Sequence, residues 1–201
     1  MNILVATHNP WKYQLFAPIF HEYGFVVETL PNASASLETV IEDGDTVVEN
    51  AVIKASHYHS PDYPWVFADD TGLEIAALDG APGVQSRRWG GKYQDDIEDQ
   101  AWLDYLLDQM REVSVGARTA QFVDGWALMT PNGNVYTREM RTSFEIALQP
   151  IRPLLAGSPI LAVAIGLPED PLEIQAEARS RWKAWGILEQ LLGETPRRIV
   201  I

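Results

Sequence analysis

The alternation of apolar and polar residues over the first thirty positions predicts a strand, a helix and a second strand. Residues 3–6 form a short apolar run with β-branched members, which is typical of a buried strand. Asn9 and Pro10 suit the N-cap and the first position of a helix, and apolar residues then recur at helical spacing until an expected end at Gly24. Residues 25–29 predict the second strand. The chain therefore opens with a β-α-β unit.

A loop and a second helix follow. Residues 31–45 contain proline, asparagine, serine and glycine and predict a loop. Thr46 and Glu49 form a capping-box pattern, so we expect a helix from there to about Tyr58. Further along, the expected elements are a buried strand at 65–68 that stops at Asp69-Asp70-Thr71-Gly72, a strand at 73–78, a turn at 80–83, a helix at 96–110, two long strands at 120–129 and 135–148 around a turn at 131–134, a strand at 160–165 and a closing helix at 179–192.

This order of elements predicts the fold class. Strands and helices alternate early and an antiparallel hairpin comes later, which favours an α/β fold with a mixed sheet. We find no clear linker and expect residues 1–201 to form a single domain. The N-terminus lacks the pattern of a signal peptide, and the longest apolar stretch, 160–165, is too short to cross a bilayer. We therefore expect a cytoplasmic protein.

Composition narrows the classes of partner. Apolar residues make up 46% of the chain and charged residues 21%, as in an ordinary globular protein, and the formal net charge is −13. Such acidity argues against binding to nucleic acid polymers and to anionic membrane surfaces. There are no cysteines, which excludes disulfides and thiolate chemistry, and the four histidines lack the usual spacing of a zinc site.

The first candidate site is the junction between the first strand and the first helix. Thr7, Asn9 and Lys12 lie there, where exposed N–H groups and the positive end of the helix dipole favour an anion. Lys12 opposes that dipole, and a bound phosphate would resolve the conflict. The alternative is a capped helix with a solvated lysine.

The second candidate site combines Glu42 with Asn50 and Lys54, the last two one turn apart on the same helix face. The chain has only four lysines against eleven arginines, so a lysine at two helix positions suggests phosphate binding. The alternative is a surface ion pair.

The third candidate site is Asp69-Asp70-Thr71, expected at the end of an apolar strand. Ligands of open α/β sheets bind at such ends, and carboxylates suit Mg²⁺ together with substrate phosphates. The alternative is an ordinary Asp-rich turn. In the glycine-rich segment 80–91, Arg87 and Arg88 beside Trp89 suit a phosphate or a base, or alternatively a structural loop with solvated arginines.

Together these segments resemble the inosine triphosphate pyrophosphatase family, which hydrolyses non-standard purine nucleoside triphosphates. The matching stretches are Ala6-Thr7-His8-Asn9-Pro10-Trp11-Lys12, Glu49-Asn50-Ala51-Val52-Ile53-Lys54-Ala55, Ala68-Asp69-Asp70-Thr71-Gly72-Leu73-Glu74, Gly80-Ala81-Pro82-Gly83-Val84-Gln85-Ser86 and Arg118-Thr119-Ala120-Gln121-Phe122. The resemblance covers residues 3 to about 130. It implies an elongated mixed sheet flanked by helices, with a cleft between two lobes, and commonly a homodimer.

The resemblance also implies a reaction and a set of roles. The reaction is Mg²⁺-dependent cleavage of a nucleoside triphosphate to the monophosphate and pyrophosphate, with Mn²⁺ as an alternative ion. Asp70 would be the base for the attacking water, supported by Asp69. The residues implied to bind the ligands are Thr7, Asn9, Lys12, Lys54, Thr71 and Arg88 for substrate, and Glu42 and Asp70 for the metal.

The last third of the chain departs from this family. Where the family has G-F-G-Y-D-P, which helps form the base pocket, this chain has Gly157-Ser158-Pro159-Ile160-Leu161-Ala162, and where the family has S-H-R it has Ser180-Arg181-Trp182-Lys183. Trp182 and Trp185 fit a core better than a stacking platform. The accepted base therefore stays open, and so do two alternatives: a catalytically weak or inactive nucleotide-binding relative, and a structural dimerising protein.

Overall fold

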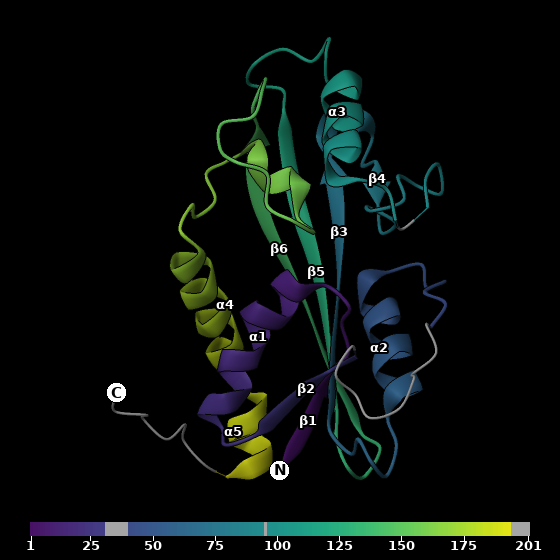
Figure 1. Cartoon of the computed structure of the whole chain (residues 1–201), viewed down its shortest axis with the longest axis vertical. Helices are drawn as coiled ribbons and strands as arrows, with labels where there is room; N and C mark the ends of the chain where they lie inside the picture. The colour runs from purple at the N-terminus through teal and green to yellow at the C-terminus, as the bar shows by residue number, and fades with distance from the viewer. Residues whose placement is uncertain (31–39, 95, 194–201) are drawn as a thin grey trace.

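The computed structural model describes residues 1–30, 40–94 and 96–193, and within them seven strands form one mixed sheet in the order β2-β1-β3-β5-β6-β7, with β4 paired to β3 (Figure 1). The strands are β1 (Asn2–Val5), β2 (Val26–Thr29), β3 (Val66–Ile75), β4 (Pro82–Gly83), β5 (Thr119–Met129), β6 (Val135–Ile146) and β7 (Ala164–Ile165). The helices are α1 (Pro10–Glu22), α2 (Val47–Tyr58), α3 (Asp99–Gln109), α4 (Pro171–Trp185) and α5 (Ile187–Leu192), with 3-10 turns η2 (Ala76–Leu78) and η3 (Pro159–Ala162). The predicted α/β class with a mixed, helix-flanked sheet is confirmed.

Two helix starts follow the predicted local chemistry. The side chain of Asn9 accepts a hydrogen bond from the Trp11 amide and caps α1. Thr46 and Glu49 form both hydrogen bonds of the capping box at α2. These bonds satisfy amide groups that have no partner inside the helix, so both helices begin at the predicted residues. Most of the predicted loop 31–45 lies outside the described residues, and 40–46 contains no helix or strand.

The expectation that the strand stops at Asp69-Asp70-Thr71-Gly72 is wrong. β3 continues through this segment and pairs with β5 over ten consecutive residues, from Val66 opposite Met129 to Ile75 opposite Ala120. An inter-strand ladder of this length overrides the low strand propensity of aspartate and glycine. The two carboxylates therefore lie in the middle of a strand and not in an Asp-rich turn.

Two further boundaries differ from the prediction in the last third of the chain. The strand expected at 160–165 is mostly the 3-10 turn η3, which starts at Pro159, and only residues 164–165 pair with β6. The closing helix begins at Pro171, with Asp170 as its N-cap, and ends at Trp185, with Gly186 as its C-cap, after which α5 follows. Asp-Pro is a helix-start signal and glycine a stop signal.

Two separate apolar cores lie on the same face of the sheet. One contains Phe67 and Trp126 together with side chains of α1 and α4. The other contains Leu73 and Ile75 together with side chains of α3 and η3. Between them, the same-face positions of β3 and β5 carry the paired residues Thr71 and Asp124. We call these two residues the polar gap, because they separate the two cores.

Helix α2 covers the opposite face of β3 and β5 (Figure 1). It approaches the sheet most closely at Gly125 of β5, where a Cβ atom would lie 2.5–2.6 Å from backbone atoms of Val47 and Val48. A Cβ atom on Gly72 of β3 would lie 3.2 Å from the Val47 side chain. Glycine at these positions therefore sets the distance between α2 and the sheet.

Within the described residues, one edge of β3 has no strand beside it at residues 69–72. β1 pairs with β3 only as far as Val5 opposite Phe67, and β4 pairs with β3 only at Leu73 and Glu74. Among the described strands, β5 alone pairs with 69–72, and it lies on the other side. We call residues 69–72 the open edge of β3.

Each of the described helices lacks the length and apolar character needed to cross a bilayer.

We expect Gly125→Ala to lower the free energy of unfolding by about 1–3 kcal/mol. The added methyl group would clash with backbone atoms of α2, which cannot move aside as a flexible side chain can. Urea denaturation monitored by circular dichroism measures this loss. The control is Ser143→Ala on the exposed side of β6, which we expect to change stability by less than about 0.5 kcal/mol. Equal stability of the two variants would contradict this account of how α2 packs.

Candidate active site

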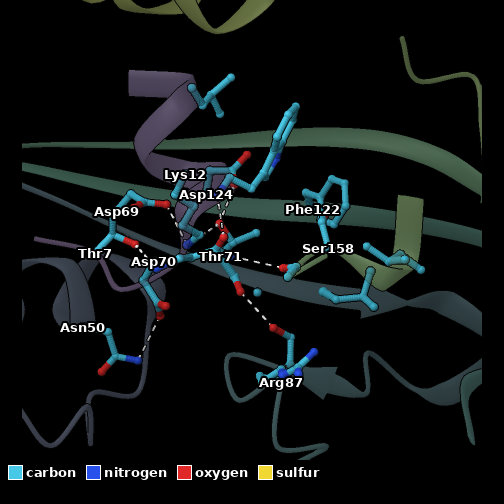
Figure 2. Close-up of a pocket in the computed structure, with 18 of the residues that line it drawn as sticks. Thr7, Lys12, Asn50, Asp69, Asp70, Thr71, Arg87, Phe122, Asp124 and Ser158 are labelled. Carbon is cyan, nitrogen blue, oxygen red and sulfur yellow. Dashed lines mark hydrogen bonds and ion pairs between the residues drawn. The ribbon is translucent and has the colours of Figure 1, made fainter. Parts of the chain in front are cut away.

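A cavity of about 970 Å³ surrounds the open edge of β3 and continues over the polar gap (Figure 2). Every residue predicted from the sequence to act in the site lines this cavity: Thr7, Asn9, Lys12, Glu42, Lys54, Asp69, Asp70, Thr71 and Arg88. They come from the β1–α1 junction, the segment before α2, α2 itself, β3 and the loop after β4. The fold thus gathers separate segments of the chain at one place.

Lys12 of α1 binds Asp69 on one face of β3. Its Nζ lies 2.7 Å from Asp69 Oδ2 and 3.4 Å from Thr71 Oγ1. Burial alone would lower the pKa of Lys12, but the carboxylates of Asp69, Asp70 and Asp124 outweigh burial and raise it. Lys12 therefore keeps its positive charge inside the cavity at neutral pH.

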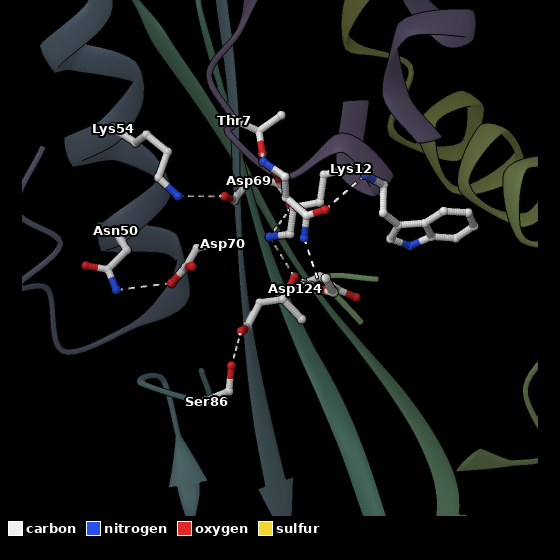
Figure 3. Close-up of polar contacts among 12 residues, drawn as sticks. Thr7, Lys12, Asn50, Lys54, Asp69, Asp70, Ser86 and Asp124 are labelled. Carbon is white, nitrogen blue, oxygen red and sulfur yellow. Dashed lines mark hydrogen bonds and ion pairs between the residues drawn. The ribbon is translucent and has the colours of Figure 1, made fainter. Parts of the chain in front are cut away.

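Lys54 and Asn50 of α2 reach β3 from the opposite face (Figure 3). Lys54 Nζ lies 3.0 Å from Glu42 Oε2 and donates a hydrogen bond of 3.1 Å to the Asp69 carbonyl. Asn50 Nδ2 donates to Asp70 Oδ2 at 3.1 Å. Successive side chains of a strand point to opposite faces, so Asp69 contacts α1 and Asp70 contacts α2.

The carboxylates of Glu42 and Asp70 are close enough to influence each other. Burial raises the pKa of Glu42, Lys54 counteracts this, and the negative charge of Asp70 raises the pKa further. Asn50 fixes one oxygen of Asp70, and the Gly44 amide fixes the Asn50 side-chain oxygen at 2.8 Å. Side chains of α2 therefore hold both carboxylates, Lys54 that of Glu42 and Asn50 that of Asp70.

Asn9 links the start of α1 to the segment before η3. Its side-chain oxygen caps α1, and its side-chain nitrogen Nδ2 donates to the Gly157 carbonyl at 3.1 Å. The Gly157 amide in turn donates to Asp99 of α3 at 2.8 Å. We call this chain of contacts the Asn9–Gly157–Asp99 bridge. The Thr7 hydroxyl accepts a hydrogen bond from the Asn9 amide at 3.0 Å and shapes the turn before α1.

The loop after β4 supplies the third wall of the cavity. Ser86 Oγ donates to the Thr71 carbonyl at the open edge at 2.9 Å, and Trp102 of α3 donates to the Ser86 carbonyl at 3.0 Å. Arg88 Nη2 lies 3.4 Å from the Glu42 carbonyl. Side chains therefore take the place of a neighbouring strand along β3.

Sequence reasoning missed Asp124, which lies on the cavity floor. Its Oδ1 accepts a hydrogen bond from the Thr71 hydroxyl at 3.0 Å, and its Oδ2 lies 3.8 Å from Nη1 of Arg181 on α4. Arg181 also pairs with Glu177. Asp124 had a detectable signal, because it interrupts a run of apolar same-face positions on β5 that includes Phe122 and Trp126.

The tryptophans near the end of the chain serve the core. Trp182 is fully buried and packs against Phe20, Phe67 and Trp126. Trp185 packs at its edge. The interpretation of these residues as core, in preference to a stacking platform, is confirmed.

Comparison with known proteins identifies the family. Residues 3–153 match the model of the Ham1 family. This chain belongs to the Ham1 family. A similar curated protein, the dITP/XTP pyrophosphatase of Corynebacterium efficiens, is 39% identical over 153 residues, which are 75% of this chain and 72% of that protein. The dITP/XTP pyrophosphatase of Bacillus subtilis is 35% identical over 147 residues, 73% of this chain and 72% of that protein. The resemblance stated from the sequence motifs is confirmed.

Solved structures of Ham1 proteins share the fold over nearly the whole chain. A Ham1 protein from Coxiella burnetii has a TM-score of 0.74 at 27% identity and covers 97% of this chain and 100% of its own. A nucleoside-triphosphatase / dITP/XTP pyrophosphatase from Mycobacterium abscessus has a TM-score of 0.62 at 30% identity. The match covers 95% of this chain and 98% of that chain. The last third therefore keeps the family fold although residues 3–153 carry the family match.

We expect Lys12→Met to lower the free energy of unfolding by about 2–4 kcal/mol, because it leaves the buried Asp69 carboxylate without its cation. Lys12 keeps 22% of its side-chain surface, which places the effect below that of a fully enclosed pair. Chemical denaturation at neutral pH measures the change.

The matched control is Lys183→Met on the exposed face of α4, which we expect to be nearly neutral. Adding Asp69→Asn to Lys12→Met should recover part of the lost stability, since no unpaired charge remains. If the double variant were as unstable as the sum of the two single variants, the ion pair would not be the cause.

Proposed function

We propose that this protein hydrolyses a nucleoside triphosphate of the non-standard purine class to the monophosphate and pyrophosphate, with Mg²⁺ as cofactor and Mn²⁺ as an alternative. The observation that carries the proposal is the meeting of all the predicted site residues around one cavity at the open edge of β3. The names of the relatives support the class of substrate.

The carboxylates at the open edge fit a magnesium ion. Mg²⁺ in proteins is held by one or two carboxylates together with water and substrate phosphates. Glu42 and Asp70 are two such carboxylates, and a dication bound between them would offset both the burial that raises the pKa of Glu42 and the smaller contribution of the Asp70 charge. Within the described residues, no group of three or more His, Cys, Asp or Glu side chains gathers as a metal site. The remaining ligands would then be phosphate oxygens and water.

Asp70 has the placement required of a base for the attacking water. Asn50 holds its Oδ2, which leaves Oδ1 to accept a proton from a water molecule in the cavity. When bound, Mg²⁺ would neutralise charge that develops on the phosphate oxygens. Asp69 pairs with Lys12 on the other face of β3. It would therefore support Asp70 indirectly, by holding Lys12 beside the strand.

Lys12 and Lys54 supply the cations for the triphosphate. Both line the cavity, and each pairs with a carboxylate, Lys12 with Asp69 and Lys54 with Glu42. These pairs hold the ammonium groups in place before any substrate arrives, and such preorganised charge stabilises a transition state with little rearrangement. These two lysines place positive charge in the cavity of a chain whose formal net charge is −13.

The proposed base end of the cavity differs from the family pattern, because this chain lacks the segments G-F-G-Y-D-P and S-H-R. It is lined by Phe122, by Ile160 and Leu161 of η3, and by Glu177 and Arg181 of α4. Discrimination between bases depends on polar groups matched to the base edge. We therefore propose that base choice is altered or relaxed relative to the named relatives. A homodimer, a single domain and a cytoplasmic location stay predictions.

The test is a panel of standard and non-standard nucleoside triphosphates, incubated with the protein and Mg²⁺ or Mn²⁺, with detection of pyrophosphate. We expect release of pyrophosphate from at least one purine nucleotide and a decrease of about 10²–10⁴-fold in kcat for Asp70→Asn, because that variant loses the base. Asp108→Asn on the exposed side of α3 serves as the control and should keep full activity.

Absence of turnover for every nucleotide with both metals would contradict the proposal. A rise in melting temperature with nucleotide but without release of pyrophosphate would favour the nucleotide-binding alternative.

A further inference from the structure

Trp11 is an aromatic residue that faces the cavity and has no place in the packed interior. Of the described residues, six with aromatic rings of the Phe, Tyr or Trp type line the cavity, namely Trp11, Phe16, Tyr58, Trp102, Phe122 and Trp126. The other five each pack in one of the three apolar clusters that the described residues form, and Trp11 packs in none. Trp11 is half-buried. A ring that lines a cavity without supporting the core is available to contact a ligand.

Trp11 and Lys12 leave α1 in different directions. Consecutive residues of a helix are about 100° apart around its axis. Lys12 reaches β3, where it binds Asp69. Trp11 shares its helix face with Leu15, four residues further on, and both line the cavity. The start of α1 therefore presents a cation to β3 and an aromatic ring to another part of the same cavity.

Helix α4 lies alongside the start of α1. The two helices pack against each other, and Nε2 of Gln175 donates to the Gln14 carbonyl at 3.4 Å. Ile174, the residue before this contact, lines the cavity together with Glu177 of the proposed base end. The starts of α1 and α4 thus border the cavity next to each other, which places Trp11 at the base end.

The base end has no aromatic residue where the family has one. The family segment G-F-G-Y-D-P contains a phenylalanine and a tyrosine, whereas residues 157–162 of this chain contain neither. Phe122, which lies away from Asp70 in the cavity (Figure 2), packs its ring against Phe144 in the core, with ring centroids 4.8 Å apart. The ring of Trp11 has no such partner among the described residues, so its faces are open to a base.

We propose that the indole ring of Trp11 stacks on the base of the substrate and supplies the aromatic platform that residues 157–162 lack. This inference rests on the proposed function and names a residue that binds the base. Stacking uses the π face that every base has and reads none of the groups on its edge. Trp11 therefore raises the affinity for ribo- and deoxyribonucleotides, and for different purines, by similar factors. Such binding fits a relaxed choice of base.

The first experiment measures kcat and KM of the full chain with Mg²⁺ for ITP, dITP and XTP. We expect Trp11→Ala to raise KM by about 5- to 100-fold, by a similar factor for each nucleotide. We expect kcat to stay within about threefold, because stacking binds the substrate and the transition state equally. Trp11→Phe keeps a ring and should stay close to the wild type, whereas Trp11→Leu, which is apolar but has no ring, should resemble Trp11→Ala.

The matched control is Leu172→Ala, which removes an apolar side chain that is 72% exposed at the start of α4 and lies outside the cavity lining. It should keep the wild-type KM. A second readout needs no turnover. Isothermal titration calorimetry compares the α,β-methylene analogue of ITP with inorganic triphosphate, which has no base. Trp11→Ala should weaken binding of the analogue by the factor seen in KM and leave binding of inorganic triphosphate unchanged.

Several results would overturn the inference. One is an unchanged KM together with unchanged binding of the analogue in Trp11→Ala. Another is a Trp11→Leu variant with wild-type values, which would show apolar contact without stacking. A loss confined to one base would assign the indole N–H to the edge of that base, and an equal loss for inorganic triphosphate would assign Trp11 to the phosphate end. Absence of turnover for every nucleotide would contradict the proposed function instead, and calorimetry would still decide whether Trp11 binds the base.

Discussion

β1 ends at Val5 while β3 continues to Ile75, and the site depends on this difference in length. A strand edge without a neighbour leaves backbone carbonyl groups that need hydrogen-bond donors. Here the donors are the side chains of Lys54, at the Asp69 carbonyl, and Ser86, at the Thr71 carbonyl. The groups that satisfy the backbone of β3 thus come from α2 and from the loop after β4, and the same contacts place a lysine and a loop around the cavity.

The polar gap explains why the molecule has a cleft instead of one continuous core. On the face that carries α1, α3 and α4, apolar side chains pack at both ends of β3 and β5, while Thr71 and Asp124 occupy the middle. Burying a carboxylate under an apolar helix would be costly without partners. Asp124 instead has Thr71 and Arg181 beside it and a cavity above. The two cores therefore remain separate, and the Asn9–Gly157–Asp99 bridge connects α1, which packs in one core, with α3, which packs in the other.

The sequence allowed prediction of those features whose cause is local. Asn9 and Thr46 start helices because their side chains bond to amides two or three residues away. The continuation of β3 through Asp69 and Asp70 could not be predicted in this way, because it depends on pairing with β5 some fifty residues later. The candidate site was found through residue types and family motifs. Asp124 was missed because its meaning appears only when β3 and β5 are placed in register.

Asp69 also contacts two helices. Its carboxylate binds Lys12 on one face of β3, and its carbonyl binds Lys54 at the open edge. Lys12 on α1 and Lys54 on α2 therefore both contact a single residue of β3. The last third of the chain contacts this arrangement through α1, which packs against α4 and whose N-cap Asn9 binds the Gly157 carbonyl. Under the proposed function, a single residue of β3 thus contacts both cations of the phosphate end, and most of the proposed base end lies beyond the family match at residues 3–153.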